Sequence, residues 1–400
     1  SRIKNCILKK VIFVSLSLFV LIISACNKEE VDAFSSYNEQ DEKLRMNQIQ
    51  IIASHNSYRL MTTDTVYSFL MSIQSLIPPQ YNPVELDYYH LPIQTQMNDY
   101  KIRGLEIDLY NDPTGNAFSA RRIDPFVGLP INSGIPELSQ PGMKVLHIKD
   151  VDYNTQFYTF KQSLQAIKLW SEGHPNHLPL FINIETKSDA PGDDSTLNSL
   201  GFLPAPLWDA AAAEAMEQEV IDVFGQNSSR LFKPIDLQGN YSSLEEAALN
   251  NNWPLLKDCR GKIAFIIEGV ALPYYINGHP SLQGRNMFVY ASPGQAEAAF
   301  VLLNDARNDS AQIKNLVNAG YIVRTRCDAG TIEARNGDYS GRDAAFESGA
   351  QILSTDYYKP DDRAGNGIWT NYQVRFPNFT TARKNPVNAK TINVNNDIND

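Results

Sequence analysis

Short apolar segments alternate with amphipathic ones along most of this 400-residue chain, and this alternation constrains the fold more than any other feature. Eight apolar segments are short, rich in β-branched or aromatic residues and bounded by polar residues, as is typical of buried strands. We predict these strands at 48–54, 103–110, 143–150, 178–187, 262–269, 285–292, 321–328 and 350–357. Between them, helical spacing of apolar residues predicts helices at 157–170, 207–224 and 310–319.

Eight strands that alternate with helices predict an α/β fold, a closed parallel (β/α)8 barrel of the TIM type. We expect the segment 60–89, which contains Pro78 and Pro79, to be an insertion after the first strand. The mostly polar segment 188–195 is expected to be a loop on the active side, after the fourth strand. A doubly wound open sheet is the main alternative, but no glycine-rich phosphate loop follows a predicted strand to favour it.

The first 26 residues have the pattern of an export signal. A basic segment precedes the apolar run 11–23, which is too short to span a bilayer because a span needs about 20 residues. The tetrapeptide ISAC, which ends at Cys26, resembles the lipobox at which bacterial lipoproteins are cleaved and acylated. We therefore expect 1–25 to be a lipoprotein signal peptide and Cys26 to carry lipid. The alternative is an ordinary signal peptide with a chance cysteine.

The remaining chain is expected to divide into three parts. Residues 26–45 are polar and acidic and are expected to be a lipidated tether. Residues 46–380 are expected to be the catalytic barrel, and the asparagine-rich residues 381–400 a flexible tail. Asn27-Lys28-Glu29-Glu30 resembles the tag that sends some lipoproteins to the outer face of the outer membrane. The expected location is the cell envelope, with a lipid anchor in the outer membrane and, if the tag functions, exposure at the cell surface.

The charge balance excludes one class of partner. The chain has 35 Lys and Arg residues against 45 Asp and Glu residues, a formal net charge of −10. A nucleic-acid backbone needs a broad basic face, so we expect no nucleic-acid partner. If Cys6 leaves with the signal and Cys26 is acylated, only Cys259 and Cys327 remain, and the sequence leaves open whether they pair or stay free.

Four polar clusters lie at or near the carboxyl ends of four consecutive predicted strands, which in a barrel meet at one mouth. Spacing of two residues on a strand points Glu106 and Asp108 to the same side. Each cluster alone is more often structural than functional. Together they bring two histidines, an asparagine and three carboxylates to largely apolar strands, although unpaired buried charge is costly. The clusters are Ser54-His55-Asn56-Ser57-Tyr58, Glu106-Ile107-Asp108, His147 and Glu185.

These residue types favour one kind of metal. Three carboxylates and one amide carbonyl suit a hard cation, and Ca²⁺ accepts roughly six to eight oxygen ligands in flexible geometry. Zinc would favour histidine or cysteine ligands. The two histidines are then available for proton transfer near neutral pH.

As an ordered set, these motifs resemble the calcium-dependent phosphatidylinositol-specific phospholipases C, especially their single-domain secreted bacterial branch. The resemblance runs from about residue 47 to residue 358. Besides the clusters, it includes His90-Leu91-Pro92-Ile93, Arg103-Gly104-Leu105, Trp170-Ser171-Glu172-Gly173-His174-Pro175 and Ser354-Thr355-Asp356-Tyr357. It implies a TIM-type barrel, calcium ligands at Asn56, Glu106, Asp108 and Glu185, and catalytic histidines at His55 and His147. Ala53 and Arg59 depart from the usual residues of the family.

The resemblance also implies a reaction and its partners. His55 would take the proton of the inositol 2-hydroxyl, and His147 would protonate the departing diacylglycerol oxygen. The products would be diacylglycerol and inositol 1,2-cyclic phosphate or inositol phosphate. The expected partners are an inositol phospholipid or a glycosylated inositol lipid, and the membrane through the N-terminal lipid, with the chain acting as a monomer. From their places on the predicted strands, Lys187, Arg324, Arg326, Asp356 and Tyr357 are candidate substrate contacts.

Three alternative functions remain open. A glycerophosphodiester phosphodiesterase shares the barrel, a strand-end histidine and an E-x-D pair, but favours arginine directly after the first histidine, where this chain has Asn56. Metal-independent bacterial phospholipases C have an arginine in place of calcium, so the acidic cluster argues against them. The third alternative is a non-catalytic surface lipoprotein that binds inositol-containing glycans, and the presence of all six expected groups argues against it.

Overall fold

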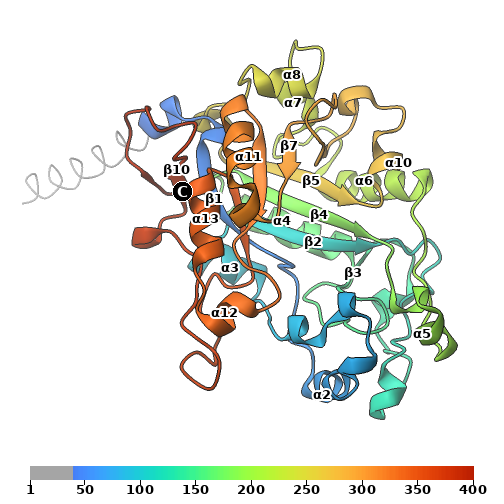
Figure 1. Ribbon diagram of the computed structural model, residues 1–400. Coiled ribbons are helices and arrows are strands. Elements are labelled where there is room, and N and C mark those ends of the chain that lie inside the picture. Colours follow the sequence, from blue (N-terminus) through green and yellow to red (C-terminus); the bar gives the residue numbers. More distant parts are fainter. Residues whose placement is uncertain (1–38) are drawn as a thin grey trace, which may run out of the picture.

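The parallel strands of the chain close into a barrel (Figure 1), seen in a computed structural model that describes residues 39–400. Their order around the barrel is β6-β5-β4-β2-β1-β9-β8-β7. The gap between β6 and β7 is bridged where the backbone N–H of Ala291 donates to the carbonyl of Phe300 at 3.1 Å. The TIM-type barrel is therefore confirmed. Its strands are β1 (Ile49–Ser54), β2 (Gly104–Tyr110), β4 (Leu180–Lys187), β5 (Ile263–Gly269), β6 (Phe288–Val289), β7 (Phe300–Leu302), β8 (Ile322–Arg326) and β9 (Ile352–Thr355).

One predicted strand lies outside the barrel, and one barrel strand was not predicted. The segment 143–150 contains only β3 (Lys144–Val145), which pairs antiparallel with β2 and is followed by turns. Its apolar residues serve separate clusters, because Val145 joins the barrel core whereas Leu146 and Ile148 join two smaller ones. The eighth barrel strand is instead β7, whose three residues are too few to show an alternating pattern.

The predicted helices are confirmed with shifted ends, as α4 (Phe160–Gly173), α6 (Ala210–Phe224) and α11 (Ala306–Ala319). Thr159 and Gln162 form a capping box at the start of α4. Within residues 39–400, no helix has the length and apolarity needed to cross a bilayer. The other helices are α2 (Asp64–Ser72), α3 (Ile93–Asp99), α5 (Ser195–Ser199), α7 (Pro234–Gln238), α8 (Leu244–Leu249), α9 (Leu256–Cys259), α10 (Leu272–Ile276), α12 (Ile332–Asn336) and α13 (Ser340–Ser348).

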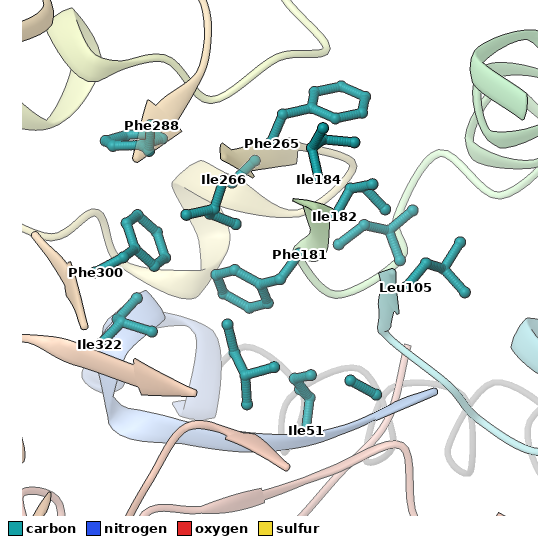
Figure 2. Close-up of a cluster of buried hydrophobic side chains, with 14 of the residues drawn as sticks. Ile51, Leu105, Phe181, Ile182, Ile184, Phe265, Ile266, Phe288, Phe300 and Ile322 are labelled. Carbon is teal, nitrogen blue, oxygen red and sulfur yellow. The ribbon is translucent and has the colours of Figure 1, made fainter. Parts of the chain in front are cut away.

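The barrel interior is apolar at its floor and polar at its mouth. Phe181, Phe300 and Ile322 point into the same interior (Figure 2), and the rings of Phe181 and Phe300 lie 6.2 Å apart. Side chains alternate along a strand, so a residue two positions after Ile322 and a residue four positions after Phe181 point inward as well. These are Arg324 on β8 and Glu185 on β4, so the floor supports the polar groups of the mouth.

The contact between β1 and β2 accounts for one departure from the family pattern. Ala53 pairs with Gly104, and a Cβ on residue 104 would lie 2.4 Å from the Cβ of Ala53. Real side chains do not approach so closely, so only one of the two positions can carry a Cβ. Alanine is tolerated at position 53 because residue 104 is glycine.

The segment expected to be a flexible tail forms strands, so that expectation is corrected. Strand β10 (Ala382–Lys384) pairs antiparallel with β1, and β11 (Asp397–Ile398) pairs with β10. Asp400 forms an ion pair with the buried Arg103. Backbone pairing requires no apolar residues, which is why an asparagine-rich sequence can still add strands.

The end of the expected tether also packs on the barrel. The guanidinium of Arg260 donates to both carboxylate oxygens of Asp41, and Leu44 is fully buried. Residues 39–45 therefore belong to the barrel domain. The expected signal peptide at 1–25 and the lipid site at Cys26 lie outside the described residues. Cys259 and Cys327 are buried free thiols.

A buried histidine predicts a pH dependence of stability. Ser171 bridges the guanidinium of Arg230 and Nε2 of His177, and His177 Nδ1 donates to the carbonyl of Leu178. Burial lowers the pKa of His177 to about 4. The unfolded chain binds a proton at His177 near pH 6.5, whereas the folded chain binds it only near pH 4. The contribution of neutral His177 to the free energy of unfolding is therefore complete above pH 6.5 and is lost as the pH falls toward 4. We expect that loss to be at most about 3 kcal/mol.

Denaturant unfolding between pH 4 and 7 tests this expectation. The unfolding free energy of His177→Gln should fall less steeply than that of the unsubstituted protein over this range. His279→Gln, at a half-buried position, is the matched control. Parallel curves for the unsubstituted protein and His177→Gln would contradict the assignment.

Candidate active site

Three carboxylates meet at the mouth of the barrel. The parallel register pairs Asp108 on β2 with Glu185 on β4, and Glu185 with Glu268 on β5. Glu106 lies two residues before Asp108 and therefore points the same way. One carboxylate oxygen from each of Glu106, Asp108 and Glu185 lies within 4.8 Å of the others. The structure thus brings together the three acidic residues proposed as metal ligands.

Two buried basic residues balance these acids. Arg324 on β8 forms an ion pair with Glu106, and Nζ of Lys187 on β4 donates to Asp108 at 3.2 Å. Burial raises the pKa of Asp108 well above its usual value, against the opposing charge of Lys187. Burial likewise raises the pKa of Glu268 to about 7, although Arg324 opposes the shift. The cluster is therefore short of positive charge.

Two oxygens at this cluster have no donor. Asn56 follows β1 with φ of 46°, a left-handed conformation that asparagine tolerates better than most residues. Its Nδ2 donates to the hydroxyl of Tyr88 at 2.9 Å, which leaves Oδ1 buried without a hydrogen bond. Asp108 Oδ1 is also buried without a partner. Buried acceptors of this kind are costly unless something satisfies them.

The turn after β1 is tied directly to the acidic strand. The backbone N–H of Ser57 donates to the carbonyl of Glu106, and the backbone N–H of Glu106 donates to Oγ of Ser57. This exchange places Asn56 beside β2. The donors of Asn56, Glu106, Asp108 and Glu185 are all oxygens, and this set fits Ca²⁺.

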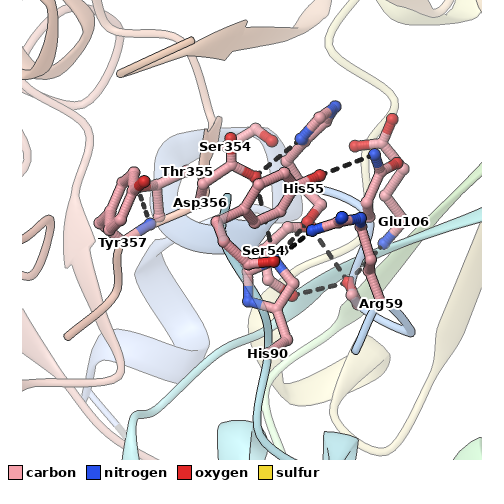
Figure 3. A network of polar contacts seen from close by, with 12 residues as sticks. Ser54, His55, Arg59, His90, Glu106, Ser354, Thr355, Asp356 and Tyr357 are labelled. Atoms are coloured by element: carbon pink, nitrogen blue, oxygen red, sulfur yellow. Dashed lines mark hydrogen bonds and ion pairs between the residues drawn. The ribbon is translucent and has the colours of Figure 1, made fainter. Parts of the chain in front are cut away.

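His55 contacts the carboxylate of Asp356 (Figure 3) and the guanidinium of Arg326. Its Nδ1 lies 2.8 Å from Asp356 Oδ1, and Arg326 donates to Nε2 at 3.1 Å. We assign the proton to Nδ1, because Nε2 must accept from Arg326. Burial and the charge of Arg326 lower the pKa of His55 well below 6.5. The ring is therefore neutral, with Nε2 unprotonated.

Asp356 contacts His55 and Arg326. Its second carboxylate oxygen accepts from Arg326 at 3.0 Å, and its backbone N–H donates to Asp328. Both carboxylate oxygens are thus engaged, which favours a role in positioning His55 over the substrate contact expected from the sequence. Tyr357 lines a separate small cavity, where its buried hydroxyl has no partner.

His147 has a similar arrangement. It lies in the turn after β3 and not at the end of a barrel strand. Its Nδ1 is 3.2 Å from Asp152 Oδ2, and the same oxygen accepts from Arg59 at 2.9 Å. Burial lowers the pKa of His147 to about 4, although the bond to Asp152 opposes the shift. The carbonyl of His147 accepts from Lys187 at 2.9 Å.

Arg59 joins three segments around the site. Besides Asp152, its guanidinium donates to Thr62 Oγ1 at 2.8 Å and to the carbonyl of Leu86 at 2.7 Å. It also stacks over the ring of Tyr88, 4.4 Å from the ring centroid. The fully buried Arg59 therefore connects the β1 turn, the insertion and the His147 turn.

These groups surround a polar cavity of about 430 Å³, part of which is open to solvent. His147 and Lys187 do not line it. Sequence reasoning missed two lining residues, Glu268 and Asn304. Glu268 follows an isoleucine on β5, as Glu185 does on β4, and the parallel register pairs these two glutamates. The lining residues are His55, Glu106, Glu185, Glu268, Asn304, Arg324 and Arg326.

A comparison with known families identifies the sequence pattern. The sequence model described as calcium-dependent phosphoinositide phospholipase C matches residues 44–386. The match covers most of the chain and includes the whole acidic cluster and both histidines. No curated protein sequence matches the chain significantly.

Solved structures with a similar fold are distant. A calcium-dependent phosphoinositol-specific phospholipase C from Pseudomonas sp. is 15% identical with a TM-score of 0.49, covering 87% of this chain and 96% of its own. A calcium-dependent phosphatidylinositol-specific enzyme from Streptomyces antibioticus is 15% identical with a TM-score of 0.42, covering 78% and 95%. A putative glycerophosphoryl diester phosphodiesterase from Silicibacter pomeroyi is 12% identical with a TM-score of 0.35, covering 80% and 94%. At this distance, these similarities support no argument about function.

The acidic cluster predicts stabilisation by calcium. A saturating hard cation that binds only the folded chain stabilises it by about 2.7 kcal/mol at a hundred times its Kd. We expect CaCl₂ to raise the unfolding midpoint by several degrees and MgCl₂ to raise it less, as measured by differential scanning fluorimetry.

Glu185→Gln tests the position of the ion. It removes one like charge, so the midpoint without calcium should not fall, whereas the calcium-induced shift should disappear. Glu172→Gln, at an exposed position on α4, is the matched control and should keep the full shift. An unchanged calcium response in Glu185→Gln would rule out this site.

Proposed function

This chain belongs to the calcium-dependent phosphoinositide phospholipase C family and is a phosphoric diester hydrolase, and on that premise we propose that it cleaves phosphatidylinositol-type lipids into diacylglycerol and inositol 1,2-cyclic phosphate. The observation that carries the proposal is the meeting of the carboxylates and the His55–Asp356 pair at one barrel mouth. When bound by Asn56, Glu106, Asp108 and Glu185, Ca²⁺ would lower the pKa of the inositol 2-hydroxyl and neutralise phosphate charge.

His55 is proposed as the general base. Its unprotonated Nε2 takes the proton of the inositol 2-hydroxyl, and the resulting alkoxide oxygen bonds to phosphorus. Asp356 fixes the Nδ1–H tautomer and stabilises the imidazolium that forms. The low pKa of the free enzyme's His55 keeps this base unprotonated at neutral pH.

His147 is proposed as the general acid. As the phosphorus–oxygen bond to diacylglycerol breaks, His147 gives a proton to the departing oxygen, and the cyclic phosphodiester is left. With a pKa of about 4 in the free chain, the ring must gain its proton as substrate binds. The negative phosphodiester favours the imidazolium, and Asp152 supports it from behind.

Arg324 and Arg326 are proposed to bind the headgroup. Both line the polar cavity, Arg324 buried and Arg326 partly exposed, and a guanidinium matches phosphate and hydroxyl oxygens. Lys187 is proposed to contact the phosphate, because it lies between Asp108 and the carbonyl of His147.

We also propose that the protein is an outer-membrane lipoprotein of the cell envelope, anchored through Cys26. The proposal rests on the basic and apolar pattern before the ISAC tetrapeptide. Metabolic labelling with an alkyne fatty acid tests it, since Cys26→Ser should abolish the label.

The role of His147 predicts a dependence on the leaving group. His147→Gln should reduce kcat on phosphatidylinositol by about 10²- to 10⁴-fold. Its cleavage of 4-nitrophenyl inositol phosphate should change far less, because nitrophenolate leaves without a proton. Equal losses on both substrates would exclude a general acid.

The role of Asp356 predicts the opposite pattern. Asp356→Asn disturbs the base, which both substrates need, so both rates should fall by about 10²- to 10⁴-fold. Asp362→Asn, at an exposed position six residues away, is the matched control and should keep full activity. Normal rates in Asp356→Asn would contradict the proposed positioning role.

A further inference from the structure

A second cavity, entirely different in chemistry, lies beside the site. It is a hollow of about 610 Å³, part of which is open to solvent, and its lining consists of Phe, Leu, Ile, Val and Pro side chains with one Tyr. The lining comes from four segments: the insertion with α2, the turn around Phe126, the turn after His147, and the region of α5. Figure 1 shows α2 and α5 on the same side of the molecule, beyond β3. This apolar pocket belongs to a small hydrophobic cluster that is separate from the barrel core.

The apolar pocket is continuous with the residues that surround the leaving group. Two lining residues flank the acid and its aspartate in sequence. Ile148 directly follows His147, and Val151 directly precedes Asp152. Tyr81 is the polar member of the lining. Burial raises the pKa of Tyr81 to about 12. The pocket therefore begins where the proposed acid would release diacylglycerol.

The rim of the apolar pocket is also apolar. Leu200 and Phe126 line the pocket and are 55% and 45% exposed, and the nearby Leu76 is 78% exposed. Three segments thus present large apolar side chains to solvent around an apolar opening. Exposed apolar groups gathered in this way mark a surface that binds a ligand, a membrane or another protein.

We propose that this apolar pocket takes one acyl chain of the lipid substrate, next to the phosphodiester bond that is cleaved. The proposal rests on the proposed function and names the part of the substrate that the polar cavity cannot recognise. A lipid whose inositol phosphate occupies the polar cavity has its glycerol near His147, and one acyl chain then extends past Ile148 into the pocket. The insertion after β1 supplies the wall that makes this possible.

Chain-length dependence on monomeric lipids tests the proposal. Short-chain phosphatidylinositols are kept below their aggregation concentration and lengthened stepwise, and kcat/KM is measured with calcium present. Each methylene that enters an apolar site is expected to raise kcat/KM by up to about fourfold. The rise should stop once the pocket is full.

Two variants locate the effect. Leu200→Gln places a polar group at the rim, and Leu197→Trp fills the pocket. Both should flatten the chain-length dependence and lower kcat/KM on the longest monomeric lipid about tenfold. Both should cleave 4-nitrophenyl inositol phosphate normally, which shows that the enzyme is folded. Leu169→Gln, at an exposed position on α4, is the matched control and should behave like the unsubstituted protein.

The outcomes separate the two proposals. Two results would overturn the acyl-chain site alone. One is cleavage by the unsubstituted protein that does not depend on chain length. The other is a chain-length dependence in Leu200→Gln and Leu197→Trp that is as steep as in the unsubstituted protein. If the two variants lose binding to phosphatidylinositol vesicles but cleave monomeric lipids normally, the rim binds a membrane surface, and the acyl-chain site is overturned as well. Failure of the unsubstituted protein to cleave any inositol phosphodiester would overturn the proposed function and the pocket with it.

Discussion

Repulsion between buried carboxylates is the constraint on which the mouth of this barrel depends. Glu106, Asp108 and Glu185 have oxygens within 4.8 Å of one another, which is unfavourable for like charges in a poorly solvated site. Arg324 and Lys187 each neutralise one of these acids. Unpaired oxygens nevertheless remain, so the protein holds the cluster together without satisfying it. The buried oxygens without a hydrogen-bond donor are the type of ligand that a hard cation binds.

Both histidines share one design. Each Nδ1 meets a buried aspartate, and each aspartate is also bound by an arginine, Arg326 for Asp356 and Arg59 for Asp152. An aspartate alone would favour the imidazolium, but burial and, after it, the nearby guanidinium offset that preference. The rings are therefore fixed in orientation while remaining neutral in the free chain. Charge brought by a ligand can then decide which ring carries a proton.

Much of this arrangement could be predicted from sequence, because strand-end motifs need only the order of the strands. The residues missed depend on contacts that sequence does not display. Asp152 and Arg59 lie 93 residues apart, and Glu268 is informative only once β4 and β5 are in register. The apolar residues of 143–150 looked like a strand but fill three separate clusters, whereas β7 is too short to be recognised. Local pattern predicted the barrel and not its exceptions.

The position of Arg59 gives the molecule a mechanical linkage. One guanidinium holds the insertion through Thr62 and Leu86, and it also holds Asp152, which orients His147. A shift of the insertion therefore also moves Asp152, or breaks its hydrogen bond with Arg59, and so affects the orientation of His147. Any event that moves the wall of the apolar pocket therefore reaches, through Arg59 and Asp152, the imidazole of the proposed general acid.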